Sequence, residues 1–73
     1  MSRIEILSEV TGKVWKIEAS PGQKVAEDDV LIIVESMKME IPVVSSDAGT
    51  LAEILVGEGD AVEEGQVVAV LEA

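Results

Sequence analysis

A chain of 73 residues, of which 48% are hydrophobic, suits one small domain and is too apolar to be disordered. Its net charge of −10 argues against nucleic-acid binding, and its longest apolar runs, residues 30–34 and 67–71, are too short to cross a bilayer. Without cysteine or histidine it lacks disulfides and typical zinc ligands, so we expect a barrel-like sheet with few unpaired edges to stabilise the core.

Eight strands are predicted, because runs rich in β-branched residues are bounded by Gly, Pro, Ser and Asp. In chain order they span residues 3–8, 12–19, 24–26, 30–36, 39–44, 49–56, 61–63 and 67–72. The alternation of buried and exposed residues is imperfect in the strands at 12–19 and 49–56. The chain therefore reads as an all-β domain.

Several residues between and within these strands predict special backbone geometry. Gly22 and Gly59 are expected at positive φ in turns, and Gly65 likewise. Asp28 takes the place of Gly65 in the first half of the chain, and Asp is one of the few residues that tolerate this conformation. Pro42 lacks an N–H, so its nitrogen must face outward or lie at a bulge.

The chain consists of two copies of one half-domain. Residues 2–36 align with residues 39–73, and only Met1, Met37 and Lys38 have no counterpart. Identical residues occupy matching positions at Ile4/Ile41, Ser8/Ser45, Gly12/Gly49, Ile17/Ile54, Gly22/Gly59, Val25/Val62, Glu27/Glu64, Val30/Val67 and Glu35/Glu72. We expect a single domain, residues 1–73, built of two equivalent halves with a lysine at their junction.

Met37-Lys38 is predicted to be the two-residue loop of a β-hairpin between the strands at 30–36 and 39–44. Such loops prefer Asn-Gly, Asp-Gly or another glycine-containing pair, because their backbones need positive φ. Met-Lys has neither residue type. Residues that are unfavourable for their own turn, with no evident gain in stability elsewhere, often belong to functional sites. Met37-Lys38 is therefore a candidate functional site.

The segment Glu35-Ser36-Met37-Lys38-Met39 resembles the biotin-attachment signature Glu-Ala-Met-Lys-Met of the biotinyl/lipoyl attachment domains. The resemblance extends over the whole chain, since glycines 12, 22, 49, 59 and 65 also match the family pattern. It implies a flattened barrel, or sandwich, of two four-stranded antiparallel sheets related by a pseudo-twofold axis. The modified lysine of such domains lies at an exposed hairpin tip.

The resemblance also implies roles for individual residues. Lys38 is the expected site of covalent biotin attachment. Met37 and Met39 are expected to contact the ligase or the carboxylase, although one of them could instead pack onto the barrel. Glu35 is expected to meet a basic residue of the ligase, unless it is a structural strand end like its counterpart Glu72. The weaker acidic candidate is the glutamate that follows Met39.

The implied function is that of a biotin carrier. A biotin protein ligase would modify Lys38, and the biotin would carry carboxyl groups between biotin carboxylase and carboxyltransferase components. The domain itself would catalyse nothing, and we expect a cytoplasmic monomer. Two alternatives use the same fold. The first is a lipoyl carrier, modified by a lipoyl ligase, or a domain that accepts both biotin and lipoate. The second is an unmodified structural or interaction barrel.

An enzyme is disfavoured by the sequence. Asp28-Asp29 and Glu63-Glu64 could suggest acid–base or metal chemistry, but neighbouring residues in a strand point to opposite faces. The chain also has no predicted insertion that could form a cleft.

Overall fold

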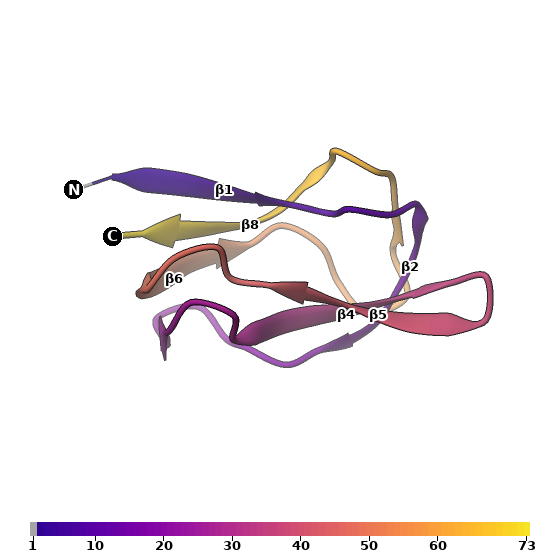
Figure 1. The fold of residues 1–73 in the computed structure, drawn as a ribbon, viewed down its shortest axis with the longest axis horizontal. Helices are drawn as coiled ribbons and strands as arrows, with labels where there is room; N and C mark the ends of the chain where they lie inside the picture. The colour runs from indigo at the N-terminus through magenta and orange to yellow at the C-terminus, as the bar shows by residue number, and fades with distance from the viewer. Residues whose placement is uncertain (1) are drawn as a thin grey trace.

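A computed structural model describes residues 2–73 and shows two four-stranded antiparallel sheets (Figure 1). The strands are β1 (Arg3–Leu7), β2 (Gly12–Ile17), β3 (Lys24–Val25), β4 (Val30–Ser36), β5 (Met39–Val44), β6 (Gly49–Ile54), β7 (Ala61–Val62) and β8 (Val67–Glu72). All eight predicted strands are present, and several end one or two residues before their predicted ends. The all-β prediction with two four-stranded sheets is confirmed.

Each sheet takes strands from both halves of the chain. The first sheet has the order β1-β8-β6-β3, and the second has the order β5-β4-β2-β7. The repeat makes β1 equivalent to β5, β2 to β6, β3 to β7 and β4 to β8. When each strand is replaced by its equivalent, the order of one sheet becomes the order of the other. Because β1 and β3 pair only with strands of the second half, neither half of the chain can complete a sheet by itself.

The loops repeat their hydrogen bonds as well. The Ser8 amide donates to the Gln66 carbonyl at 2.9 Å, and the Ser45 amide donates to the Asp29 carbonyl at 2.8 Å. Both serines are buried, and each hydroxyl donates to the carbonyl two residues further on, at 2.7 and 2.6 Å. Buried hydroxyls need such partners, so the matching serines in the sequence reflect matching local structure.

Two equivalent bulges explain the imperfect alternation in the sequence. The pairing of β2 with β4 skips Trp15, and the pairing of β6 with β8 skips Ala52. An extra residue in one strand shifts the inside–outside pattern by one position. For this reason Val14 is buried and Ile17 packs against the core, although the two residues are three positions apart.

The core between the sheets is aliphatic. Its fully buried large side chains include Leu31, Ile32, Val34, Leu51, Val62, Val68 and Leu71. Trp15 is not part of this core: it lies on the outside with 49% of its surface exposed. Among the described residues, the two sheets are therefore held together by aliphatic side chains, with no aromatic residue between them.

The turns adopt the conformations that the sequence predicts. Gly22 and Gly59 both have φ of 91°, and Gly65 has φ of 87°. Asp28, the counterpart of Gly65, has φ of 73°. The prediction of positive φ at these four positions is confirmed.

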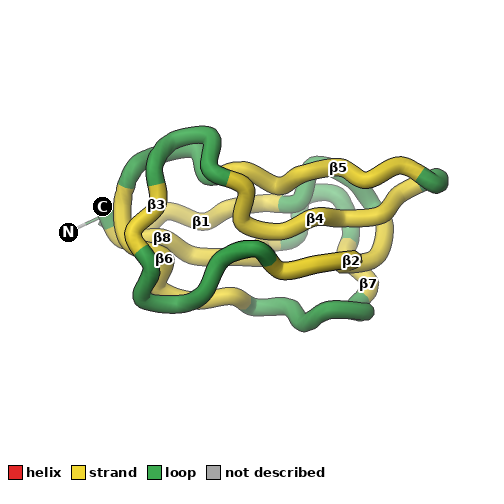
Figure 2. Tube along the Cα trace, turned by 90° about the horizontal axis from the view of Figure 1, so that it is seen from below, coloured by secondary structure: helices red, strands yellow, loops and turns green. Residues whose placement is uncertain are grey.

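Of the predicted forms, a flattened barrel or a sandwich, the structure has the sandwich, because the two sheets do not close on themselves. The sheets remain separate and leave β1, β3, β5 and β7 as edge strands (Figure 2). Short edges, proline and charged side chains protect an open sheet from pairing with other chains. Here β3 and β7 have two residues each, β5 contains Pro42, and β1 carries Arg3 and Glu5. Pro42 thus lies on an edge strand, where its missing N–H is tolerated.

Candidate functional site

The hairpin between β4 and β5 ends in a tight turn made of Met37 and Lys38. Ladder pairing continues to Ser36 opposite Met39, so only two residues remain for the loop. Met37 has φ of 51° and Lys38 has φ of 66°, as in a type I′ turn. The predicted two-residue hairpin loop is confirmed, and it is formed without glycine or asparagine. The turn lies at the opposite end of the long axis from the chain termini (Figures 1 and 2).

The three side chains at the tip are exposed. Met37 is 93% exposed and Met39 is 64% exposed, so packing onto the sheets does not account for either methionine. Lys38 is also exposed. The one ion pair within residues 2–73 joins Lys16 to Glu18, at 3.3 Å, so Lys38 has no carboxylate partner. Its amine is accessible to a reagent or an enzyme from outside.

The base of this hairpin is fixed, in contrast to its tip. The Ser36 hydroxyl donates a hydrogen bond to the Thr11 carbonyl at 2.8 Å. The Thr11 hydroxyl in turn accepts a hydrogen bond from the Glu64 amide at 3.1 Å. These contacts connect the hairpin with the β1–β2 loop and with the turn before β8. The base of the hairpin that presents Lys38 is therefore bonded to two other loops.

The two acidic candidates face each other below the tip. Glu35 of β4 is opposite Glu40 of β5, and on its other side it is opposite Lys13 of β2. All three side chains are exposed. Like charges directly opposite each other on a sheet are mildly destabilising, so packing gives no reason for this pair. A role of Glu35 in ligase recognition stays a prediction.

Comparison with known proteins identifies the family. The profile of a family described as "Biotin-requiring enzyme", the biotin/lipoyl family, matches residues 4–71. The chain belongs to this family. The domain is 36% identical over 67 residues to the "Biotinylated protein TB7.3 homolog" of Mycobacterium leprae, covering 92% of this chain and 94% of that protein. It is 39% identical to the "Biotin/lipoyl attachment protein" of Bacillus subtilis, covering 81% of each.

A solved structure agrees with the family assignment. The urea carboxylase of Kluyveromyces lactis contains a segment that matches this biotin/lipoyl domain with a TM-score of 0.94 and 39% identity. The match covers 99% of this chain but only 6% of that much larger enzyme. Together with the names of the small relatives, it indicates that this domain is a carrier rather than a catalyst.

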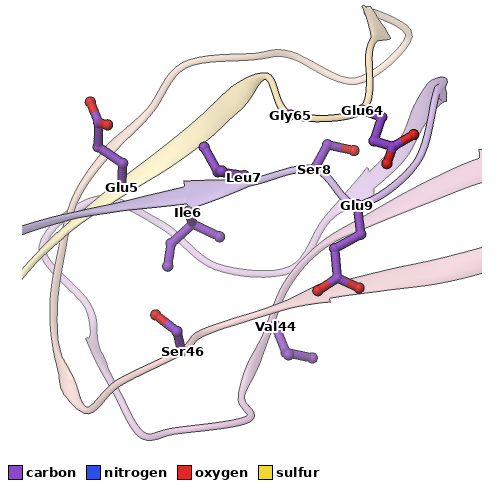
Figure 3. Close-up of a pocket in the computed structure, with 9 residues that line it drawn as sticks. All are labelled: Glu5, Ile6, Leu7, Ser8, Glu9, Val44, Ser46, Glu64 and Gly65. Carbon is purple, nitrogen blue, oxygen red and sulfur yellow. The ribbon is translucent and has the colours of Figure 1, made fainter.

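One cavity of the biotin/lipoyl domain, shown in Figure 3, is lined by no residue of the hairpin tip. It has a volume of about 370 Å³ and lies between β1, the end of β5 and the turn before β8. Its lining consists of Glu5, Ile6, Leu7, Ser8, Glu9, Val44, Ser46, Glu64 and Gly65. None of the site residues predicted from the sequence lines it. The candidate site is thus a protrusion and not a pocket.

The acidic pairs in the sequence lie in the turns between strands. Asp28-Asp29 belongs to the turn between β3 and β4, and Glu63-Glu64 belongs to the turn between β7 and β8. Asp29 instead closes its own turn by accepting a hydrogen bond from the Ala26 amide at 2.9 Å. Within residues 2–73 no group of acidic side chains is arranged to hold a metal ion. This part of the chain also has no helix long and apolar enough to cross a membrane.

Proposed function

We propose that Lys38 is biotinylated by a biotin protein ligase and that the domain carries carboxyl groups between the active sites of a biotin-dependent carboxylase. One observation carries the proposal: an exposed lysine occupies a type I′ turn between two exposed methionines in a member of the biotin/lipoyl family. The names of the relatives, which include a biotinylated protein and a carboxylase, support the proposal.

Attachment requires a partner enzyme. A lysine amine is a nucleophile only after it has lost its proton, and the domain places no carboxylate base beside Lys38. The ligase would therefore remove the proton and present biotin as an acyl-adenylate. The Nζ–C amide bond forms, the bond to the phosphate breaks, and AMP leaves. The exposed tip on a fixed base suits a substrate that must enter the active site of another protein.

The geometry also suits a carrier. Biotin would supply a ring nitrogen that takes up and releases a carboxyl group. The residues of this chain hold the attachment point at the far end of the long axis, with the methionine side chains free to contact a partner. A tether raises the local concentration of the attached group at each partner site. Biotin carboxylase and carboxyltransferase components are the proposed partners.

The first test is labelling with purified biotin protein ligase. We expect ligase, ATP and biotin to label the wild-type domain once and to leave Lys38→Ala unlabelled, as detected by streptavidin blotting and intact mass. Lys24→Ala is the matched control, because Lys24 is also an exposed lysine but lies in β3 and not in the hairpin turn, and it should be labelled like the wild type. Label on the Lys38→Ala variant would show that another lysine is the acceptor.

A lipoyl carrier is the second candidate function. It is favoured by the name of the Bacillus subtilis relative, which includes both cofactors, and it would use the same Lys38 and a lipoyl ligase. The flanking methionines favour biotin through their resemblance to the biotin signature. The same reaction with lipoyl ligase and lipoate distinguishes the two, and absence of both labels would favour an unmodified structural role. Cytoplasmic location and the monomeric state stay predictions.

A further inference from the structure

Trp15 is a residue that the fold does not require. It is the only aromatic residue of the chain, it lies outside the core, and 49% of its surface is exposed. Its counterpart in the second half, Ala52, occupies the equivalent bulge of β6. A small side chain thus satisfies the same local structure, and the large indole at position 15 needs another explanation.

Trp15 lines a shallow depression next to the attachment hairpin. The depression has a volume of about 240 Å³, and its lining consists of Lys13, Val14, Trp15, Glu35 and Gly59. Lys13 and Glu35 face each other across β2 and β4 but form no ion pair. The depression therefore combines a flat apolar surface, one hydrogen-bond donor group and one acceptor group whose charges are not already paired. The equivalent positions on the other sheet hold Thr50, Ala52 and Glu72, without an aromatic residue or a cation.

We propose that this depression binds the ring of the biotinyl group carried by Lys38. The inference rests on the proposed function. The bicyclic ring of biotin has an apolar body and a ureido group with N–H donors and a carbonyl acceptor. The body would cover the indole of Trp15, the Glu35 carboxylate would accept from a ureido N–H, and the Lys13 ammonium would donate to the ureido oxygen.

The arm is long enough to reach the depression. Glu35 precedes Lys38 by three residues, and because the turn at Met37-Lys38 shortens this path, their Cα atoms lie within about 10 Å, the length of three extended residues. An extended chain advances roughly 1.2 Å per bond, so the eleven bonds from the lysine Cα to the biotin ring span about 13 Å. The arm therefore spans the separation between Lys38 and Glu35, which lines the depression together with Trp15, without movement of the strands.

Docking of the ring on its own domain would regulate its delivery. A partner site receives only the undocked fraction of the arm, so its apparent affinity falls in proportion to the docked population. The contact needs little intrinsic affinity, because the tether supplies a high local concentration. A ring that lacks the ureido group, such as the dithiolane of lipoate, would lose both polar contacts.

The single tryptophan makes the proposal measurable. The biotinylated domain, with modification verified by intact mass, is compared with the unmodified domain by Trp15 emission and by quenching with acrylamide. We expect a shift to shorter wavelength and a fall of the quenching constant by about half, because the ring covers one face of the indole. Unchanged emission and quenching in a fully modified sample would overturn the inference and leave the proposed function intact. Failure of the ligase to modify Lys38 would count against the proposed function instead.

A second measurement is independent of any ligase. The chain contains no cysteine, so Lys38→Cys offers one thiol for a thiol-reactive biotin or for a dithiolane reagent with the same linker. We expect the biotin reagent to shield Trp15 at least twofold more than the dithiolane reagent, because only biotin reaches Glu35 and Lys13 with hydrogen-bonding groups. Equal shielding by both reagents would overturn the inference.

Matched variants test the polar contacts. Glu35→Gln and Lys13→Met in the Lys38→Cys background should each lose most of the biotin-dependent shielding, while Trp15 remains as the reporter. Glu72→Gln is the control, because Glu72 is the exposed counterpart of Glu35 on the other sheet. It should retain the shielding. Equal shielding in Glu35→Gln and Glu72→Gln would rule out the assigned contact.

Discussion

At Met37 and Lys38 the backbone favours residues such as Asn and Gly, whereas a partner enzyme would need the side chains of Met and Lys. Both residues have positive φ, which costs a residue with a side chain about 1–2 kcal/mol relative to a right-handed conformation. Asn-Gly would form the same turn more easily. The sequence keeps Met-Lys, and both side chains face solvent. We infer that accessibility to a partner, and not stability, determines these two residues.

Met37→Asn separates the stability of the turn from recognition by the ligase. Asparagine tolerates positive φ, so we expect the free energy of unfolding to rise by about 0.5–1 kcal/mol. We also expect slower biotinylation, because the thioether contact with the ligase is lost. Chemical denaturation and the initial rate of ligase labelling measure the two effects.

Met37→Leu is the control for this variant, because it keeps an apolar side chain and has no advantage at positive φ. It should be labelled faster than Met37→Asn and should not be more stable than the wild type. Labelling of Met37→Asn at the wild-type rate would contradict a recognition role for Met37.

At the scale of strands and turns, the glycines have two different physical roles. Gly12 in β2 and Gly49 in β6 lie against backbone: a Cβ at Gly49 would be 2.6 Å from the Glu72 carbonyl oxygen, and one at Gly12 would overlap that of Glu35. Gly22 has open space around it and is required only by its φ of 91°. The close contact at Gly12 brings β2 against the strand that supports the attachment hairpin.

Substitution by alanine and by asparagine distinguishes the two roles. At Gly22 we expect asparagine to cost less stability than alanine, because asparagine adopts positive φ more easily. At Gly12 we expect alanine to cost about 1–3 kcal/mol and the larger asparagine to cost more, because the strands must move apart. Thermal unfolding of the four variants measures this. The same order of alanine and asparagine at both positions would contradict the assignment of roles.

At the scale of the whole molecule, the two halves are interlocked and not merely adjacent. Every sheet contains strands of both repeats, and the pairs of buried serines hold equivalent loops in place. The pseudo-twofold arrangement leaves one feature without a counterpart in the other half, the turn at Met37-Lys38. We infer that the functional asymmetry of the domain is concentrated at that turn and at Trp15 of β2.

Interlocking predicts the behaviour of the separated halves. Peptides of residues 1–36 and 37–73 should each lack stable β structure alone, because each keeps only one strand pair, β2 with β4 or β6 with β8, and an isolated two-stranded pair is marginally stable. Circular dichroism and the dispersion of amide proton resonances measure this. A folded spectrum from either peptide by itself would contradict the interlocked arrangement.

The sequence predicts the strands and the attachment turn well, because the repeat shows each signal twice. Gly22 and Gly59 reveal the turns, and the missing counterpart of Met37-Lys38 reveals the hairpin. The sequence does not predict the open sheet edges, since closure depends on how far the sheets separate. It also does not reveal that Trp15 faces outward, because a bulge reverses the alternation of burial. The alignment of Trp15 with Ala52 was the available signal.

The central claim is that Lys38 carries biotin, and the intact mass of the protein isolated from its native cells tests it most directly. We predict a species heavier than the unmodified chain by one biotinyl group, and only unmodified chain when Lys38→Ala is expressed in the same cells. A lipoyl group alone, no modification in biotin-replete cells, or a biotinyl group that persists in Lys38→Ala would contradict the claim.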